Sequence, residues 1–118
     1  MLFKTALPAF YAEVRQLLVK EGRRDLAEQL PELHLARRCA CKQRDCATFY
    51  VTGARPLNVV EKNVIGIRHG ESIPLDADTG WVVFDVDNFG RPTGIEVLNR
   101  DDVFEALERL GDEAWFAS

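Results

Sequence analysis

The chain has 118 residues, of which 47% are hydrophobic and 29% charged, a composition typical of one soluble globular domain. It contains no apolar run of the ~20 residues that a membrane helix needs, and no signal-peptide pattern at its N-terminus. We therefore expect a single cytosolic domain, residues 1–118, whose core needs neither disulfides nor a metal for stability.

The charge is unevenly divided along the chain. Residues 1–46 carry nine Lys and Arg against six Asp and Glu, whereas residues 47–118 carry six against thirteen. The basic excess lies beside the cysteines, at Arg37, Arg38, Lys42 and Arg44. A nucleic-acid-binding surface is usually broader and interleaved with aromatic residues, so this pattern disfavours nucleic acid as a partner.

Two helices are expected at the N-terminus. Apolar residues recur at helical spacing over residues 7–18, with polar residues on the other face. Thr5 is the expected N-cap, Pro8 fits the first turn, and Gly22 should end the helix in a left-handed conformation. A short second helix is expected over residues 23–30. It should end there because Pro31 follows, and the residue before a proline avoids the α region.

The middle of the chain alternates with a period of two, which predicts six short strands. They span residues 33–36, 47–51, 64–69, 72–75, 81–86 and 93–98. Turn residues at 78–80 and 88–90 separate the last three strands, as an antiparallel meander requires. Val82, Phe84 and Val86 form the expected core face of the central strand.

A last helix is expected after residue 98. Asn99 or Asp101 can cap it, apolar residues between 103 and 110 face inward, and Gly111 is the expected stop. Two helices, a run of strands and one helix do not alternate regularly. This order predicts an α+β domain with an antiparallel sheet of about four to six strands.

All three cysteines of the chain lie close together, at Cys39, Cys41 and Cys46. An odd count argues against a disulfide framework. Thiolates are good zinc ligands, and the neighbouring basic residues favour the deprotonated form. One interpretation is therefore a structural zinc site that these thiolates form with His69, with Asp45 or with water.

Two other interpretations of the cysteines stay open. A pair of them can be redox-active, or all three can be small apolar side chains packed in a tight loop. The single residue between Cys39 and Cys41 is a shorter spacing than the two to four residues usual in zinc sites. His34 should lie on the opposite face of its strand, separated from Cys39 by roughly 17 Å of chain.

The segment Arg68-His69-Gly70-Glu71 follows an apolar strand and resembles the start motif of the histidine phosphatases, in which the histidine accepts the phosphoryl group. Those enzymes need a second histidine downstream, and none follows His69 in this chain. The segment therefore favours a strand that runs into a glycine turn.

Residues 85–96 have the acidic residues and the glycine of a calcium loop at several positions. A phenylalanine replaces the oxygen ligand at the fifth position, and the flanking segments are predicted strands rather than helices. Asp85 and Asp87 are therefore expected on the solvent face of a hairpin strand.

Residues 80–98 contain a strand that ends in a D-x-D-x-x-G turn, followed by a second strand with the sequence Gly-Ile-Glu-Val-Leu. This stretch resembles small bacterial domains of unknown function of the DUF2283 type. The resemblance covers less than the last third of the chain. It implies a bacterial source and a strand-turn-strand unit, and it brings no activity.

These patterns favour a small bacterial module for binding or assembly with a structural zinc site at the cysteines. The alternative is a small thiol-dependent or zinc-dependent enzyme centred on the same residues. Trp81 and Val83 are expected on the outer face of the sheet, where either the C-terminal tail or a partner protein must cover them. We expect that partner to be a second copy of the chain in a homodimer.

Overall fold

A computed structural model of the chain describes residues 1–41, 43–53 and 69–116, with only the backbone for His69. The first part holds the helices α1 (Phe3–Ala6), α2 (Pro8–Lys20), α3 (Arg24–Ala27) and η1 (Leu30–Glu32). The strands are β1 (His34–Arg38), β2 (Phe49–Thr52), β3 (His69–Leu75), β4 (Trp81–Asp87) and β5 (Pro92–Leu98). The last part holds α5 (Asp101–Glu108) and η2 (Asp112–Ala114). The expected α+β class is confirmed.

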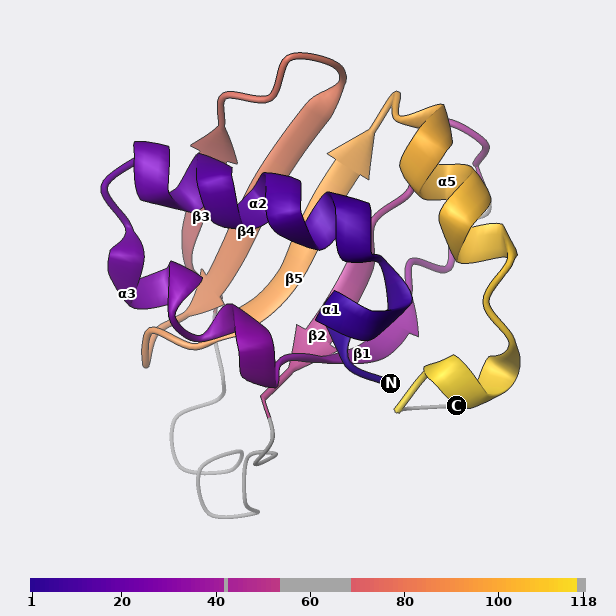
Figure 1. The fold of residues 1–118 in the computed structure, drawn as a ribbon, viewed down its shortest axis with the longest axis horizontal. Coiled ribbons are helices and arrows are strands. Elements are labelled where there is room, and N and C mark those ends of the chain that lie inside the picture. The colour runs from indigo at the N-terminus through magenta and orange to yellow at the C-terminus, as the bar shows by residue number, and fades with distance from the viewer. Residues whose placement is uncertain (42, 54–68, 117–118) are drawn as a thin grey trace.

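The described strands form one antiparallel sheet in the order β1-β2-β5-β4-β3. The expected meander of β3, β4 and β5 is confirmed, and Gly80 (φ 71°) and Gly90 (φ 77°) occupy its turns in the left-handed region. β2 then pairs with β5, which joins the β1-β2 hairpin to the meander. Figure 1 shows α2 crossing one face of this sheet. None of the described helices has the length and apolar character needed to cross a membrane.

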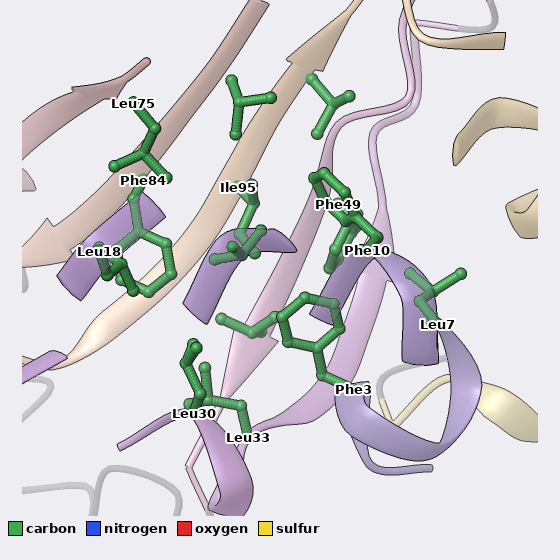
Figure 2. Close-up of a cluster of buried hydrophobic side chains, with 14 of the residues drawn as sticks. Phe3, Leu7, Phe10, Leu18, Leu30, Leu33, Phe49, Leu75, Phe84 and Ile95 are labelled. Atoms are coloured by element: carbon green, nitrogen blue, oxygen red, sulfur yellow. The ribbon is translucent and has the colours of Figure 1, made fainter. Parts of the chain in front are cut away.

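The core lies between α2 and the sheet (Figure 2). Three aromatic rings meet there edge to face, with centroids 5.5 Å apart for Phe3 and Phe49 and 6.2 Å apart for Phe10 and each of the other two. Such pairs add roughly 0.5–1.5 kcal/mol each beyond the area that they bury. The expected core face of β4 is confirmed, because Val82, Phe84 and Val86 are all buried.

A buried cation, Arg100, joins α2 to the start of α5. The guanidinium of Arg100 donates to Glu13 at 2.7 and 2.8 Å and to Asp102 at 2.9 and 3.0 Å. It also donates to the carbonyl of Thr79 at 3.3 Å. These hydrogen bonds, with Glu13 first and Asp102 second, raise the pKa of Arg100 far above its usual range. The paired cation fixes the first turn of α5 against the rest of the fold.

The N-terminal helices differ in part from the prediction. Gly22 does end α2 with φ 77°, as expected. Thr5 lies inside α1, so the N-cap of α2 is Leu7, with Pro8 at the first helical position. The second helix is only the single turn α3, which ends before the expected residue 30. Pro31 does not mark the end of a helix but lies in the first turn of η1, where its missing N–H costs no hydrogen bond.

The C-terminal helix also has different ends. Its N-cap is Arg100 rather than Asn99 or Asp101, and Asn99 takes a left-handed φ of 56° that turns the chain into the helix. Gly111 does not stop α5, which ends before it at Glu108. Gly111 has φ −80° and starts η2 instead.

β3 is continuous where two strands were predicted. Of the predicted strand 64–69, residues 64–68 lie outside the described residues, and His69 continues directly into the second predicted strand. Gly70 makes a bulge rather than a turn. A Cβ at this position would collide with the backbone carbonyl of Asp87, so glycine allows β3 to approach β4 here.

Asp87 is buried, not on the solvent face as predicted. Its carboxylate accepts hydrogen bonds from the backbone N–H groups of Phe89 (2.8 Å) and Arg91 (2.9 Å), which hold the β4-β5 turn. Asp85 accepts a hydrogen bond from the Ser72 hydroxyl at 2.6 Å. Within the described ranges the two aspartates belong to no metal-ligand cluster, so they serve the turn and the sheet.

On the outer face of the sheet, which carries Trp81 and Val83, only one of these two apolar side chains is exposed. Trp81 is 54% exposed, but Val83 on the same face is only 5% exposed within the single chain. The described part of the tail lies along the edge strand β1, where Phe116 donates its backbone N–H to the carbonyl of Leu35 at 2.8 Å. The chain terminus therefore covers part of the edge strand β1, which would otherwise offer unpaired backbone groups.

Candidate metal centre

The loop between β1 and β2 carries the three cysteines and is fixed near both ends by the backbone. Cys39 donates its N–H to the carbonyl of Thr48 at 3.0 Å, and Cys46 donates to the carbonyl of Gln43 at 3.1 Å. Cys46 also forms an isolated antiparallel bridge with Leu98 at the end of β5. The first and last cysteines of the loop are therefore positioned by the sheet itself.

The three sulfur atoms form a compact cluster. The Sγ atoms of Cys39, Cys41 and Cys46 all lie within 4.8 Å of one another, and none is in a disulfide. Cys41 is exposed, while the other two are half-buried. Sulfurs bound to tetrahedral zinc at ~2.3 Å are ~3.8 Å apart, so side-chain movements of ~1 Å would bring these three into a coordination sphere.

The environment distinguishes Cys46 from Cys41. Partial burial alone would raise the pKa of Cys46, but hydrogen bonds from the backbone N–H and hydroxyl of Thr48 and from the other two thiols outweigh it and lower this pKa. At Cys41 a hydrogen bond from the backbone N–H of Gln43 lowers the pKa, but the interactions with Cys46 and Cys39 outweigh it and raise this pKa. Cys46 is thus better prepared than Cys41 to be a thiolate.

Helix α5 forms the other wall of the site (Figure 1). The guanidinium groups of Arg38 and Arg44 lie 4.9 and 5.0 Å from the centre of the Phe104 ring, and Arg38 donates to Glu108 at 2.6 Å. A cavity of about 320 Å³ separates the loop from the helix. Its lining includes Arg38, Cys39, Gln43, Cys46, Phe104 and Glu108. No sequence pattern indicated that Phe104 and Glu108 belong to this site, because only the tertiary fold brings α5 to the loop.

Of the candidates for a fourth ligand, Asp45 is not in this cluster. Within the described part of the chain, no His, Asp or Glu joins the three sulfurs. The backbone carbonyl of Asp45 accepts a hydrogen bond from Asn99 at 2.8 Å, but its carboxylate is not part of the group. The backbone of His69 pairs with Asp87 on β4, at the end of the sheet away from the loop, and its side chain lies outside the described residues.

His34 and the phosphatase-like segment also lie apart from the site. His34 pairs with Thr52 at the start of β1, whereas Cys39 follows the end of that strand. Arg68 lies outside the described residues. Glu71 of the same segment accepts a hydrogen bond from Arg23 at 3.0 Å, which is a surface ion pair.

A scan against protein-family models and searches of curated proteins and of solved structures found no match to this chain. The resemblance of residues 80–98 to DUF2283-type domains therefore stays a prediction. The fold and the site define an α+β domain in which three cysteines lie close enough together to bind a metal ion.

Proposed function

We propose that the loop from Cys39 to Cys46 binds one zinc ion through three thiolates, and that the domain is a binding or assembly module organised around this centre. The observation that carries the proposal is the approach of all three sulfurs to within 4.8 Å. Three cysteines that served only as packed apolar side chains would have no need to turn their sulfurs toward one another.

The proposed centre has three protein ligands and one further position. Structural zinc sites are usually closed by four protein ligands, whereas sites with three keep a position for water or another molecule. Water is the proposed fourth ligand, because no His, Asp or Glu side chain among the described residues joins the three sulfurs. The cavity beside Cys39 and Cys46 gives that water or a replacing group room to enter.

Metal analysis of four variants tests the proposal. Protein purified under reducing conditions, loaded with zinc and desalted should hold one zinc per chain. Cys39→Ser, Cys41→Ser and Cys46→Ser should each hold much less, because each removes one of three ligands. Ala40→Ser is the matched control, since it places a serine in the same exposed turn and removes no thiol.

Circular dichroism of each variant shows whether the fold is intact, so that lost zinc reports on the ligand and not on unfolding. A wild-type protein without stoichiometric zinc would contradict the proposal. Retention of full zinc by all three cysteine variants would contradict it equally, because the ion would then have other ligands.

The second candidate function is a thiol-dependent enzyme with Cys46 as its nucleophile. Two observations favour it: the pKa of Cys46 is lowered, and this cysteine lines the cavity beside α5. Iodoacetamide labelling of the metal-free protein at neutral pH, followed by mass mapping, tests it. Cys46 should react before the more exposed Cys41. Faster labelling of Cys41 would contradict this function.

A further inference from the structure

The cluster departs from ordinary zinc sites in two independent ways. It brings together three sulfur donors, and within the described ranges no oxygen or nitrogen ligand of His, Asp or Glu completes a fourth corner. The paired cysteines Cys39 and Cys41 are separated by one residue, whereas zinc sites commonly separate theirs by two to four. The three-sulfur donor set is explained if the ion needs only three ligands.

Soft monovalent copper is an ion with these requirements. Thiolates select soft ions, and copper in its +1 state forms stable complexes with three sulfurs in one plane, without a fourth ligand. At the same bond length of ~2.3 Å, sulfurs at the corners of a trigonal complex are ~4.0 Å apart, compared with ~3.8 Å in a tetrahedron. Sulfurs within 4.8 Å of one another can reach either arrangement by movements of ~1 Å, so the three-sulfur donor set, and not the separation, favours the trigonal complex.

The loop is built so that one sulfur can adjust while the other two stay in place. Cys39 and Cys46 are held by backbone hydrogen bonds and by the bridge to β5. Cys41 is exposed, so its side chain is free to move toward the plane of an ion held by the other two. A three-coordinate ion requires only this movement, with no fourth group brought in from solvent.

The surroundings also suit a complex of higher negative charge. Three thiolates give a net charge of −1 with divalent zinc and −2 with monovalent copper. The guanidinium of Arg38 lines the same cavity as Cys39 and Cys46, and Phe104 holds Arg44 beside it. The pairing of Arg38 with Glu108 and the ion pair of Arg44 with Glu105 at 3.8 Å reduce this stabilisation but leave both guanidinium groups beside the loop.

We infer that the three thiolates of this loop hold monovalent copper as a three-coordinate ion and take it in preference to zinc. The inference rests on the proposed function, because it uses the same three ligands. No electron is transferred: the copper ion enters as Cu⁺, the zinc ion leaves as Zn²⁺, and the three thiolates remain ligands throughout.

The test is an anaerobic displacement titration of the zinc-loaded chain. Cu⁺ is supplied as a complex with a weak chromogenic chelator under a mild reductant, and a zinc-sensitive dye reports the ion that leaves. One equivalent of Cu⁺ should release one equivalent of zinc from the wild type and from Ala40→Ser. X-ray absorption at the copper edge should show three sulfur neighbours and no nitrogen or oxygen neighbour.

Metal-free Cys41→Ser protein is the second arm of the test. Its affinity for Cu⁺ should fall by more than the roughly 100-fold that loss of an outer hydrogen-bonding partner can cost at a metal site. Zinc that stays bound in the presence of one equivalent of Cu⁺ would overturn the inference and leave the proposed function standing. A copper ion with four neighbours, or several coppers per chain, would overturn it as well. Failure of both ions to bind would refute the inference and the proposed function together.

Discussion

The buried cation at the start of α5 predicts that its two acidic partners contribute unequally to stability. The side chain of Arg100 is 6% exposed, compared with 31% for Glu13 and 67% for Asp102. Without the Glu13 carboxylate, the buried guanidinium keeps the neutral Thr79 carbonyl and, as its acidic partner, Asp102, which water largely screens. Without the Asp102 carboxylate, it keeps the shorter and better-buried pair at 2.7 and 2.8 Å.

The magnitudes follow from this difference in burial. Removing one partner of a fully buried ion pair costs roughly 3–5 kcal/mol. Glu13 is one-third exposed, and a glutamine still accepts one hydrogen bond, so Glu13→Gln is expected to cost about 2 kcal/mol of unfolding free energy. Exposed ion pairs contribute roughly 0–1 kcal/mol, so Asp102→Asn is expected to cost less than about 1 kcal/mol.

Urea unfolding at pH 7, followed by circular dichroism, measures both changes against the wild type. The slope of the free energy against urea concentration should be the same in all three proteins, so that the midpoints report stability directly. If Asp102→Asn proved as destabilising as Glu13→Gln, burial would not be what sets the strength of these pairs, and the reasoning would be refuted.

Three further predictions concern the turn, the thiols and the outer face. Gly90→Val should lower the free energy of unfolding by about 1–2 kcal/mol, because a β-branched residue is strained at φ 77°. Its zinc content should match that of the wild type, and a stable variant with less zinc would contradict the separation of this turn from the cysteine loop. Thr48→Val should raise the pKa of Cys46 in the metal-free protein, since it removes the hydroxyl that helps to lower that pKa, whereas Thr48→Ser keeps the hydroxyl and should leave it unchanged. Alkylation rates at several pH values measure this pKa, and a pH dependence in Thr48→Val equal to that of the wild type would contradict the hydrogen bond from Thr48 to Cys46. Trp81→Ser should dissociate the proposed homodimer without unfolding the chain, and a wild-type protein that sediments as a monomer at micromolar concentration would exclude that dimer.

Local patterns predicted the parts of the fold that depend on neighbours in sequence. The helical spacing located α2, and glycines at the turns located the meander, because both signals arise within one element or one hairpin. The sequence could not predict that Phe49 pairs with Ile95, since this contact depends on how two distant hairpins meet. The alternation of strand residues also predicted, wrongly, that Asp87 lies on the solvent face. That pattern does not reveal that its carboxylate accepts hydrogen bonds from the backbone of the following β4-β5 turn.

The three cysteine ligands of the candidate site could be predicted from the sequence, but the residues that line the cavity beside them could not. Three cysteines within one short loop are confined by chain length to one region, so their approach was a fair expectation. The choice of His69 as a companion rested only on the parity of its strand, and the pairing of its backbone with Asp87 depends on strand order. The contribution of Phe104 from α5 is equally a product of the tertiary fold, in which Arg100 fixes the start of that helix.

If three thiolates bind one ion, the thiols must release their protons when the ion binds, and the number of protons released can be measured. Free thiols have a pKa of ~8.5 and are protonated at pH 6, so each thiol that becomes a ligand must release its proton. Calorimetric titration of the metal-free protein with zinc at pH 6, in two buffers of different ionisation enthalpy, counts these protons. We expect one zinc per chain and close to three protons released per zinc. Release of one proton or none on binding, or no binding, would contradict it.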